Sequence, residues 1–445
     1  MKISVIGAGY VGLVTGSCFS EFGYEVVCID KDKKKINLLK KNIIPIYEPG
    51  LTDLVNKNTK SRHLSFSDNL KDVKGSKIIF IAVGTPTARR GEGEADLKYV
   101  YEVCTNLAKE LRNTDKPIIV TKSTVPIGTG KKIIQLFKKY CPKLQYGTDY
   151  SIASNPEFLR EGSAIEDFLR PDRVVCGVDN KNALNILKEL YRPLNLREAP
   201  LLFTDIESAE LIKYASNAFL ALKISFINEM SDLCEKVGAN VQMIAKGMGL
   251  DNRIGSKFLH PGPGFGGSCF PKDTRALYAS FKKNNVKSTL VKSVIEFNEQ
   301  RKINMVKKVT YLLKPPFKIR KVAFLGVTFK PNTDDLRESP SLTIIPRLKK
   351  LGIKVAAHDP AYSKLFNNVK EFKGVFWKRN IFHAVKDADL MVVHTEWNEY
   401  RAINFNKIKK IISSPIILDL RNIFNSNELS KSGFKYYNIG EKNET

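Results

Sequence analysis

The segment best suited to chemistry is a glycine-rich stretch that ends in a cysteine, Pro261–Asp273 (PGPGFGGSCFPKD). Its glycines let the loop fold closely around a ligand. Pro271 is typical of the first turn of a helix, so backbone N–H groups and the positive end of a helix dipole should lie near the thiol of Cys269. These groups and Lys272 favour a thiolate nucleophile, whereas Asp273 opposes it and suits the handling of water or protons. The competing interpretation is an inert buried thiol, which we expect for Cys18, Cys28, Cys176 and Cys234.

Two polar residues in a long helical stretch also have a suggestive spacing. Lys213 and Asn217 are four positions apart and therefore share one face of the helix, among apolar neighbours such as Tyr214 and Phe219. The lysine then either faces a cleft, partly desolvated, or is an ordinary surface lysine whose stem packs on apolar groups. The sequence leaves both alternatives open.

Three polar segments follow predicted strands, at the carboxyl edge where open α/β sheets bind ligands. Each alone would be an ordinary turn, but their common position favours a functional role for Thr124 and for the region around Glu157. Glu157 and Glu161 are four positions apart and could act as a base, position water or hold a sugar. An ion pair with Arg160 or Arg170 explains them equally well. The segments are Gly84-Thr85-Pro86, Ser123-Thr124-Val125-Pro126 and Asn155-Pro156-Glu157.

A glycine turn near the N-terminus predicts a dinucleotide site. The strand Lys2–Ile6 runs into Gly7, Gly9 and Gly12 of a G-x-G-x-x-G pattern, and a helix follows. Glycines here allow a tight turn, close approach of backbone N–H groups to a pyrophosphate, and close helix–strand packing. Asp30 ends the second strand, where a carboxylate binds the ribose hydroxyls and repels a 2′-phosphate. NAD is therefore favoured over NADP, although the lysine cluster just after Asp30 could accommodate the extra phosphate.

The elements that position these residues alternate between short apolar strands and helices, which indicates a doubly wound α/β sheet. From about Asp205 to Val237 the chain is helical, with Thr204 and Glu207 at capping-box spacing. At about 1.5 Å per residue this helix is roughly 50 Å long and suits a connector or dimer spine. We expect two Rossmann-like domains, 1–203 and 315–440, with a helical domain, 204–300, between them. The long central helix belongs to this helical domain and joins the two Rossmann-like domains. The second Rossmann-like domain has no glycine fingerprint after its first strand. The expected strands are Lys2–Ile6, Glu25–Ile29, Lys77–Val83, Pro117–Lys122, Tyr150–Ser154, Arg173–Val178, Lys321–Gly326, Lys354–His358, Asp389–His394 and Pro415–Leu420.

Composition restricts the class of protein. A chain of 445 residues, 43% hydrophobic and 27% charged, is typical of a globular protein with about three domains. No run approaches the roughly 18 apolar residues of a membrane span. Seven cysteines without a CxxC pair and five unclustered histidines argue against disulfides and metal sites and favour the cytoplasm. The net charge of +26 is spread over helices and loops, so we expect no nucleic-acid or membrane partner, although it would attract small anions.

The chain resembles the UDP-glucose/GDP-mannose dehydrogenase family along essentially its whole length. The order and spacing of the motifs make the resemblance specific, and only Thr87–Glu94, around Arg89-Arg90, is less typical. The matching segments are GAGYVGLVTG (7–16), VGTP (83–86), STVPIGTG (123–130), NPEFLREGSAIEDF (155–168), ELIKYASNAF (210–219), NRIGSKFLHPGPGFGGSCFPKD (252–273) and GVTFKPNTDDLRESP (326–340).

The resemblance implies a two-step, four-electron oxidation of the C6 alcohol of UDP-glucose to UDP-glucuronate, with two NAD+ reduced. Cys269 would add to the intermediate aldehyde, and the second oxidation would leave a thioester that water hydrolyses. Lys213 and Asn217 would stabilise the oxyanion. The residues implied to hold or activate water and to relay protons are Asp273, Thr124 and Glu161.

The resemblance also implies the binding residues. Lys330 would meet the phosphates, and Arg253 would reach the substrate of a neighbouring subunit, which implies a homodimer with the long helix at its core. The second Rossmann-like domain would hold the UDP half. The implied NAD-binding residues are Gly7, Gly9, Tyr10, Val11, Gly12, Asp30, Lys35, Thr85, Pro86, Thr124, Glu161, Lys272 and Arg337. The implied sugar-nucleotide residues are Phe158, Leu159, Arg160, Glu161, Lys213, Asn217, Arg253, Phe258, Leu259, His260, Pro261, Gly262, Gly266 and Lys330.

Three alternatives remain. The substrate could be GDP-mannose or a UDP-N-acetylhexosamine, although Ser268 before the cysteine and FPKD after it resemble the UDP-glucose branch. The chain could instead be a non-catalytic NAD-binding redox sensor with Cys269 as the sensing thiol. On charge alone, it could bind nucleic acid. Turnover of a panel of nucleotide sugars, with the NADH counted, separates these alternatives.

Overall fold

The computed structural model describes residues 1–88, 93–112, 115–195 and 199–442, so Arg89-Arg90 lies outside the described residues. The chain forms two compact units. Unit 1 comprises Met1–Ser216 and Arg275–Val286, and unit 2 comprises Asn217–Thr274 and Lys287–Thr445.

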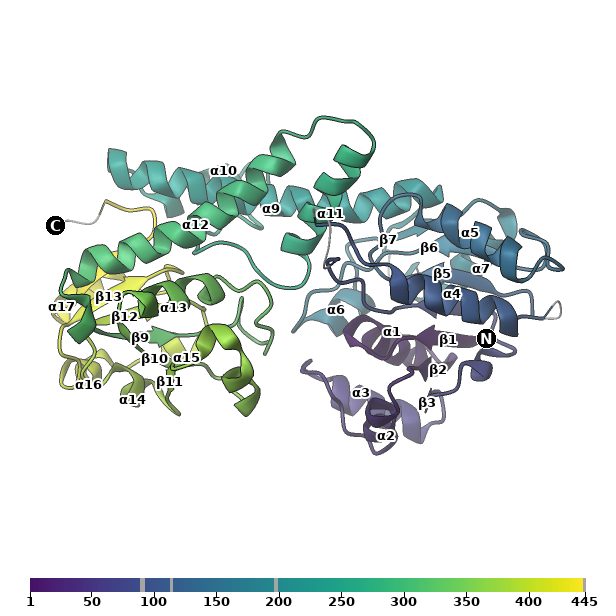
Figure 1. The fold of residues 1–445 in the computed structure, drawn as a ribbon, viewed down its shortest axis with the longest axis horizontal. Coiled ribbons are helices and arrows are strands. Elements are labelled where there is room, and N and C mark those ends of the chain that lie inside the picture. The colour runs from purple at the N-terminus through teal and green to yellow at the C-terminus, as the bar shows by residue number, and fades with distance from the viewer. Residues whose placement is uncertain (89–92, 113–114, 196–198, 443–445) are drawn as a thin grey trace. The chain divides into compact units, whose positions relative to one another are not determined.

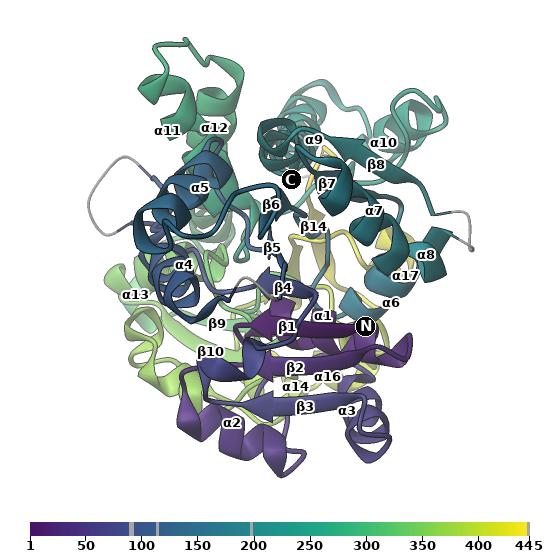
Figure 2. The ribbon, with the colours of Figure 1, turned by 90° about the vertical axis from the view of Figure 1, so that its right-hand side faces the viewer.

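Unit 1 is built on one sheet of short, largely buried strands. At its middle, β1 (Lys2–Ile6) pairs in parallel with β2 (Glu25–Ile29) and β4 (Ile78–Ile81), placing Ile3 beside Val26 and Ile78. The strand order is β3-β2-β1-β4-β5-β6-β7-β8, with β6 and β7 antiparallel. Figure 2 shows β4, β1, β2 and β3 in succession. The other strands are β3 Leu64–Ser67, β5 Ile118–Thr121, β6 Ser151–Ser154, β7 Val174–Gly177 and β8 Leu201–Thr204.

Helices cover both faces of this sheet, because successive strand side chains point to opposite sides and both sets are apolar. One core joins the strands to α1, α3, α6 and α7, and another joins them to α4 and α5. Figure 2 shows α4 and α5 on one side of the strands and α6 and α7 on the other. The helices are α1 Tyr10–Glu21, α2 Lys33–Lys40, α3 Leu51–Lys60, α4 Lys98–Glu110, α5 Thr129–Tyr140, α6 Ala164–Leu169, α7 Lys181–Leu190 and α8 Arg192–Asn195.

The longest helix, α9 (Ile206–Val237), begins in unit 1 and ends in unit 2 along the chain. Its predicted extent is confirmed, but the predicted capping box of Thr204 and Glu207 is wrong. Asp205 is the cap: its Oδ1 accepts the Ser208 N–H and its Oδ2 the Ser208 hydroxyl, both at 2.7 Å. The helix starts one residue later than the capping-box spacing assumed, so the acceptor three residues before Ser208 is Asp205. The helices that follow are α10 Val241–Gly249, α11 Phe270–Lys283 and α12 Leu290–Leu313.

Unit 2 contains a second, wholly parallel sheet. Here β9 (Lys321–Leu325) pairs with β10 (Lys354–His358) and β12 (Leu390–Val393), in the order β11-β10-β9-β12-β13-β14 (Figure 1). One core joins this sheet to α12 and α13, and another joins it to α14, α15, α16 and α17. The remaining elements are β11 Phe376–Trp377, β13 Ile416–Asp419, β14 Lys435–Asn438, α13 Ser341–Lys350, α14 Ile381–Val385, α15 Asn398–Arg401, α16 Phe405–Lys409 and α17 Ser426–Lys431.

The two sheets confirm the predicted doubly wound α/β fold class. Every strand predicted from the sequence is present, with ends shifted by one or two residues at most. The strands that the sequence analysis missed are β3, β8, β11 and β14, which are the edge strands of the two sheets.

Candidate functional site

The glycine turn after β1 is packed tightly on two sides and open on a third. Gly7 has a φ of +105°, and a Cβ there would meet the Ala82 carbonyl oxygen at 2.6 Å. A Cβ on Gly12 would meet the Gly7 carbonyl oxygen at 1.7 Å, whereas a Cβ on Gly9 would meet no atom within 4 Å. The turn is therefore closed by glycine packing and leaves room at Gly9, where a pyrophosphate can approach the N-terminus of α1.

A cleft of about 360 Å³ lies beside this turn, lined by Gly7, Gly9, Asp30 and Lys35. Asp30 Oδ2 accepts the Ala8 N–H at 2.9 Å and Lys35 Nζ at 2.8 Å. Burial raises the pKa of Asp30, but hydrogen bonds from Lys35 and from the Asp32 and Ala8 backbone outweigh it and lower the pKa below its usual value. Asp30 is therefore a fixed carboxylate at the end of β2, as ribose recognition requires. Further lining residues that the sequence analysis missed are Leu70, Tyr99 and Asn106.

Tyr10 and Val11 open α1, and the Tyr10 hydroxyl is tied to the turn that contains Glu161. It donates to Glu48 and accepts the Gly162 N–H at 3.0 Å. Glu48 also accepts the Gly162 N–H at 2.6 Å and the Ala164 N–H at 2.7 Å. Burial and Glu48 raise the pKa of Tyr10 far above its usual value, so the phenol stays protonated. Glu48, which the sequence analysis missed, thus links the start of α1 to the half-buried Glu161 turn.

The segments that follow β4 and β5 are bonded to each other. Thr85 Oγ1 donates to the Thr124 carbonyl oxygen at 2.9 Å, and Ser123 Oγ donates to the Val83 carbonyl oxygen at 2.6 Å. Thr85 is buried, Thr124 half-buried and Pro86 exposed. The carboxyl edge of the sheet thus brings together two of the three polar segments singled out in the sequence.

A buried ion pair joins Glu157, which follows β6, to Lys213 on α9. Lys213 Nζ lies 3.3 Å from Glu157 Oε1, and the two side chains are 4% and 6% exposed. Lys213 Nζ also lies 5.1 Å from the centroid of the Phe158 ring, and the Arg173 guanidinium stacks at 3.8 Å from that centroid. Lys213 is therefore a desolvated lysine and not a surface one.

The alternative pairing of Glu157 with Arg160 or Arg170 is wrong. Arg160 binds Asp167 at 2.6 Å, and Arg170 lies 3.4 Å from Glu166. Both arginines are exposed and pair with carboxylates on α6, whereas Glu157 points inward. The half-buried Leu159 and the exposed Arg160 follow it in the same loop.

Lys122, at the end of β5, is a buried cation that the sequence analysis missed. Its Nζ donates to Asn155 Oδ1 at 2.9 Å and lies 6.0 Å from the ring centroids of Phe80 and Tyr191. Burial lowers the pKa of Lys122 to about 8. A lysine directly before the Ser123-Thr124 turn, at the ligand-binding edge of a parallel sheet, was the available signal.

In unit 2, Cys269 directly precedes α11, and its carbonyl oxygen accepts the Asp273 N–H at 2.8 Å. Its Sγ is half-buried and lies 3.5 Å from the Ser268 hydroxyl. The other cysteines are buried, and burial raises the pKa of Cys28, Cys104 and Cys176 to about 12. Cys269 is thus the thiol of this chain that is best placed to react.

Asp273 is fully buried in the first turn of α11 and receives two side-chain donors. Asn217 Nδ2 donates to Oδ2 at 2.6 Å, and Lys272 Nζ donates to Oδ1 at 2.5 Å. Each carboxylate oxygen keeps a second acceptor position, which can hold a water or receive a proton. The structure thus places Asn217, Asp273 and Lys272 in one hydrogen-bonded group.

The residues before the cysteine form a loop with an unusual backbone. Phe258 has a φ of +66°, and its ring lies 5.9 Å from that of Phe270. Leu259 is buried, whereas His260 is exposed. Gly266 is closely packed, since a Cβ there would meet the Glu338 carbonyl oxygen at 2.5 Å.

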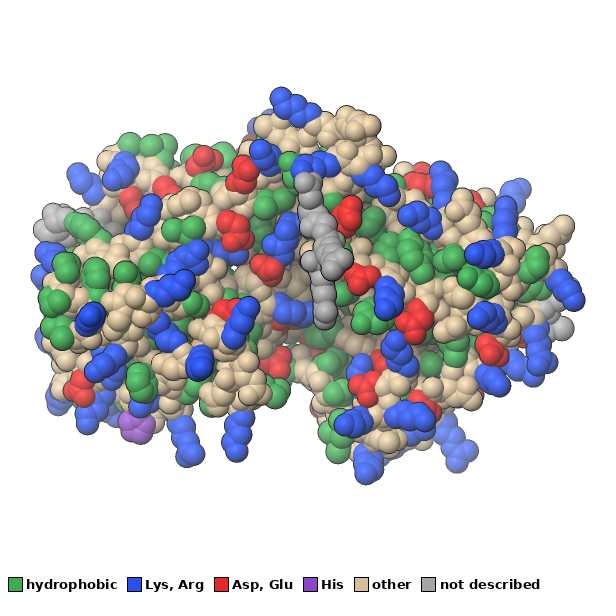
Figure 3. Space-filling view, in the orientation of Figure 1, with side chains coloured by type: hydrophobic (Ala, Val, Ile, Leu, Met, Phe, Trp, Pro, Cys, Tyr) green, Lys and Arg blue, Asp and Glu red, His purple; other side chains and the backbone are tan. Residues whose placement is uncertain are grey.

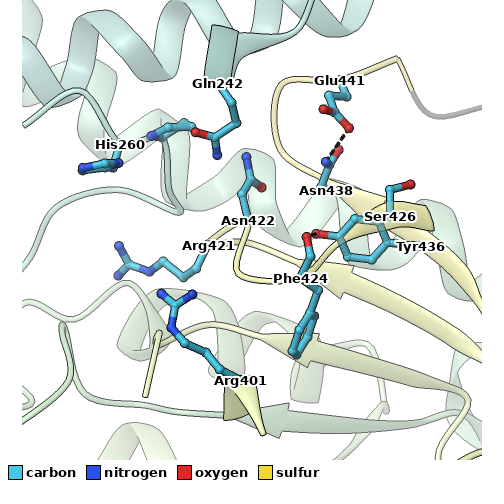
Figure 4. A pocket seen from close by; sticks show the side chains of 11 residues that line it. Gln242, His260, Arg401, Arg421, Asn422, Phe424, Ser426, Tyr436, Asn438 and Glu441 are labelled. Atoms are coloured by element: carbon cyan, nitrogen blue, oxygen red, sulfur yellow. Dashed lines mark hydrogen bonds between the residues drawn. The ribbon is translucent and has the colours of Figure 1, made fainter. Parts of the chain in front are cut away.

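A cavity of about 290 Å³ opens where β13 and β14 end, lined by His260, Pro261, Arg401, Arg421 and Tyr436 among others. Figure 4 shows the guanidinium groups of Arg401 and Arg421 lying near each other, with His260 across from them. Two cations and an exposed imidazole at a parallel sheet's carboxyl edge suit an anionic or polar ligand.

Arg421 is a second residue that the sequence analysis missed. Its Nε donates to the His394 carbonyl oxygen at 2.8 Å and its Nη2 to the Phe329 carbonyl oxygen at 3.1 Å. A Cβ on Gly262 would meet its Nη1 at 3.0 Å, so the guanidinium lies against the loop. It follows β13 with one residue between, a position typical of ligand-binding residues.

Lys330 and Arg337 lie in the segment that packs on Gly266-Gly267. The Gly267 N–H donates to the Arg337 carbonyl oxygen at 2.8 Å, and Lys330 Nζ lies 5.5 Å from the Phe329 ring centroid. The Arg337 guanidinium is exposed and binds Asp335 at 2.7 Å. Arg253 lies outside this segment: its side chain is 90% exposed and bonded to Asp251 at 2.6 Å.

Two general properties concern the described part of the chain. It contains no group of three or more His, Cys, Asp or Glu residues arranged to hold a metal ion. No helix among the described residues combines the length and apolarity needed to cross a membrane. Figure 3 shows Lys and Arg side chains scattered over the visible face among acidic and hydrophobic ones.

Comparison with known proteins places the whole chain in one family. Models of the UDP-glucose/GDP-mannose dehydrogenase family match residues 1–195 (NAD binding domain), 207–300 (central domain) and 323–426 (UDP binding domain). The UDP-glucose 6-dehydrogenase of Rhizobium meliloti (strain 1021) is 50% identical over 443 residues, which cover 99% of each chain.

Solved structures similar to this chain are also nucleotide-sugar dehydrogenases. A UDP-glucose dehydrogenase from Pyrobaculum islandicum is 34% identical with a TM-score of 0.89, covering 98% of this chain and 96% of that one. A UDP-D-ManNAc dehydrogenase from Pyrococcus horikoshii is 25% identical with a TM-score of 0.86, covering 100% of both. This chain therefore belongs to the UDP-glucose/GDP-mannose dehydrogenase family of NAD-dependent enzymes.

Proposed function

We propose that this protein oxidises the C6 alcohol of UDP-glucose to the carboxylate of UDP-glucuronate, using two NAD+, and that Cys269 carries the intermediate. The observation that carries the proposal is a half-buried thiol directly before α11, one helical turn before the buried Asp273, in a chain half identical to a UDP-glucose 6-dehydrogenase. A carbon that changes from alcohol to acid passes through an aldehyde, and a thiol that captures it prevents its loss.

Gly7, Gly9, Gly12 and Asp30 are the groups that would hold NAD+, which when bound supplies the electron acceptor for each oxidation. The Cys269 thiolate adds to the aldehyde carbon, the second oxidation leaves a thioester, and water releases the carboxylic acid and the free thiol.

Side chains around these steps have distinct roles. Lys213 and Asn217 donate to the developing oxyanion, an effect worth about 3 kcal/mol per donor in comparable sites. Asp273 accepts the proton of the attacking water, and Thr124 and Glu161 position water and relay protons. Glu157 supplies the counter-charge that keeps the Lys213 side chain in place.

The UDP half is assigned to unit 2. Lys330 and Arg421 supply cations for the diphosphate, while the loop from Phe258 to Gly262 lines the sugar nucleotide. The cavity lined by His260 and Arg421 supports this assignment, as does the match of residues 323–426 to a UDP binding domain.

A homodimer is part of the proposal. The α9 side chains of Phe219, Phe226 and Leu233 are 62%, 40% and 53% exposed at seven-residue spacing, and Leu250 after α10 is 75% exposed. Such a stripe is costly in water, and a second copy would bury it and bring Arg253 toward the partner's substrate. Light scattering should give a dimer, and Phe219→Asp with Leu233→Asp should give monomers. A monomeric wild-type protein at micromolar concentration would contradict this part.

The deciding experiment counts NADH. Purified protein should release about two NADH per UDP-glucose, and Cys269→Ala should form no net acid, with Cys234→Ala as the matched control at a buried thiol. Normal acid yield from Cys269→Ala would refute the covalent mechanism. Faster turnover of GDP-mannose or a UDP-N-acetylhexosamine would reassign the substrate. We also propose a cytoplasmic location, in keeping with seven free cysteines.

A further inference from the structure

Three buried polar side chains that no step above uses converge on the loop before Cys269. They are Asn228 of α9 and Asn298 and Arg301 of α12, which are 1%, 3% and 1% exposed. Each of the three side chains hydrogen-bonds to the main chain of the loop, and Arg301 also bonds to α9. All of these residues belong to unit 2.

Gly262 has both of its backbone groups bound by this set. Its N–H donates to Asn228 Oδ1 at 2.8 Å, and its carbonyl oxygen accepts Arg301 Nε at 3.0 Å. The rest of the Arg301 guanidinium is anchored on α9, through Ser231 Oγ at 3.0 Å and through Asp232. The position of the Gly262 peptide is thus fixed by two helices.

Phe265 is held in the same way by a single amide. Its N–H donates to Asn298 Oδ1 at 2.8 Å, and its carbonyl oxygen accepts Asn298 Nδ2 at 3.1 Å. Gly264, which directly precedes Phe265, has a φ of +122°, and a Cβ there would meet Asn298 Oδ1 at 2.9 Å. The side-chain amide of Asn298 therefore fits in this place only because position 264 is glycine.

A loop in neither helix nor sheet must pair its buried backbone groups with side chains or water. Here side chains from two helices satisfy them before any ligand arrives, so the loop does not have to become ordered on binding. We propose that Asn228, Asn298 and Arg301 are positioning residues that preset the loop 258–267 for the nucleotide, and so set affinity for the UDP half while leaving NAD binding unchanged. The identity of the nucleotide rests on the proposed function.

A matched pair of substitutions at one position tests this proposal. Asn228→Asp keeps the acceptor for the Gly262 N–H, whereas Asn228→Leu has nearly the same shape and no acceptor. Titration with UDP should give a dissociation constant within threefold of wild type for Asn228→Asp and at least tenfold higher for Asn228→Leu. The Leu variant should also raise KM for UDP-glucose at least tenfold with kcat changed by less than threefold.

The controls separate positioning from folding. Gln300→Ala, an exposed change on α12 beside Asn298 and Arg301, should match wild type, and NAD+ affinity should stay within twofold in every variant. Equal loss of UDP and NAD+ affinity, or UDP binding by Asn228→Leu as tight as wild type, would overturn the proposal. If the Leu variant does not fold, hydrogen exchange of the wild-type protein decides: the amides of Gly262 and Phe265 should be protected without UDP, and fast exchange there would overturn it. Failure of the NADH assay would leave these UDP measurements intact and refute only the proposed function.

Discussion

Gly9 and Gly12 lie in the same turn, yet an added methyl group should affect a different property at each. Gly9 has a φ of −80° and a ψ of −168°, which any residue adopts, and its Cβ position is open. Gly9→Ala should therefore lower the free energy of unfolding by only about 1 kcal/mol or less, the cost of Ala in place of Gly at a helix N-cap. Because the methyl group fills the space that a pyrophosphate must approach, the dissociation constant for NAD+ should rise at least about tenfold, or about 1.4 kcal/mol.

Gly12→Ala should instead destabilise unit 1. The new Cβ would lie 1.7 Å from the Gly7 carbonyl oxygen, so the turn or helix α1 must move. The turn resists this movement, since the Gly7 N–H donates to the Ile29 carbonyl oxygen at 2.7 Å. Overpacking costs about 1–3 kcal/mol, and we take the upper value of about 3 kcal/mol because the new Cβ meets backbone, which cannot rotate away. For a unit of roughly 200 residues each kcal/mol lowers Tm by about 2–4 °C, so we expect a decrease of about 6–12 °C.

Thermal unfolding without ligand and calorimetric titration with NAD+ measure the two effects separately. Gln135→Ala is the control, since this exposed residue lies on α5 and does not line the cleft beside the turn. NAD+ binding by Gly9→Ala at wild-type strength would refute the path assigned to the pyrophosphate. An unchanged Tm for Gly12→Ala would refute the close packing of α1 on the turn.

Three further predictions concern buried charges. Lys122→Met should raise the free energy of unfolding at pH 7 by about 1–3 kcal/mol, because burial lowers the pKa of Lys122 to about 8. In denaturant titrations this gain should fade from about pH 8 to 10.5, as the folded wild-type lysine becomes neutral and the unfolded one stays charged. Burial raises the pKa of Glu210 to about 7 from near 4.5, so its contribution to stability is greatest below pH 4.5 and falls by about 3 kcal/mol as the pH rises through 7. Glu210→Gln should flatten that part of the Tm–pH profile, and an unchanged slope would exclude Glu210 as its source. Glu157→Gln should cost about 3–5 kcal/mol by leaving Lys213 without its carboxylate, and a loss below about 1 kcal/mol would show that the lysine is stabilised by other groups.

The central strands could be predicted from the sequence because they are buried on both faces and read as continuous apolar runs. The edge strands could not. The segments Leu64–Ser67 (LSFS) and Lys435–Asn438 (KYYN) are polar at alternate or terminal positions, since one side of an edge strand has no neighbour. Their conformation is decided by the strand that they pair with, which a local pattern does not reveal.

The same distinction applies to the candidate site. The spacing of Lys213 and Asn217 identified one helix face, but the partner of Lys213 is Glu157, which is 56 positions earlier. For Glu157, local spacing suggested Arg160 or Arg170 as the partner, because a helix rule can propose only neighbours in sequence. Lys122 and Arg421 were missed for a related reason: a single basic residue after a strand is common, and only the assembled sheet edge shows what surrounds it.

The contrast between Cys269 and the six buried cysteines makes this a protein with one thiol that reagents in water can reach. An alkylating dye at neutral pH should label one position per chain, which allows a fluorophore to be attached without engineering away the other sulfurs. The same property concentrates oxidative damage. Hydrogen peroxide would convert one sulfur to sulfenic acid, and loss of turnover would follow that single lesion mole for mole until a reducing agent restored it.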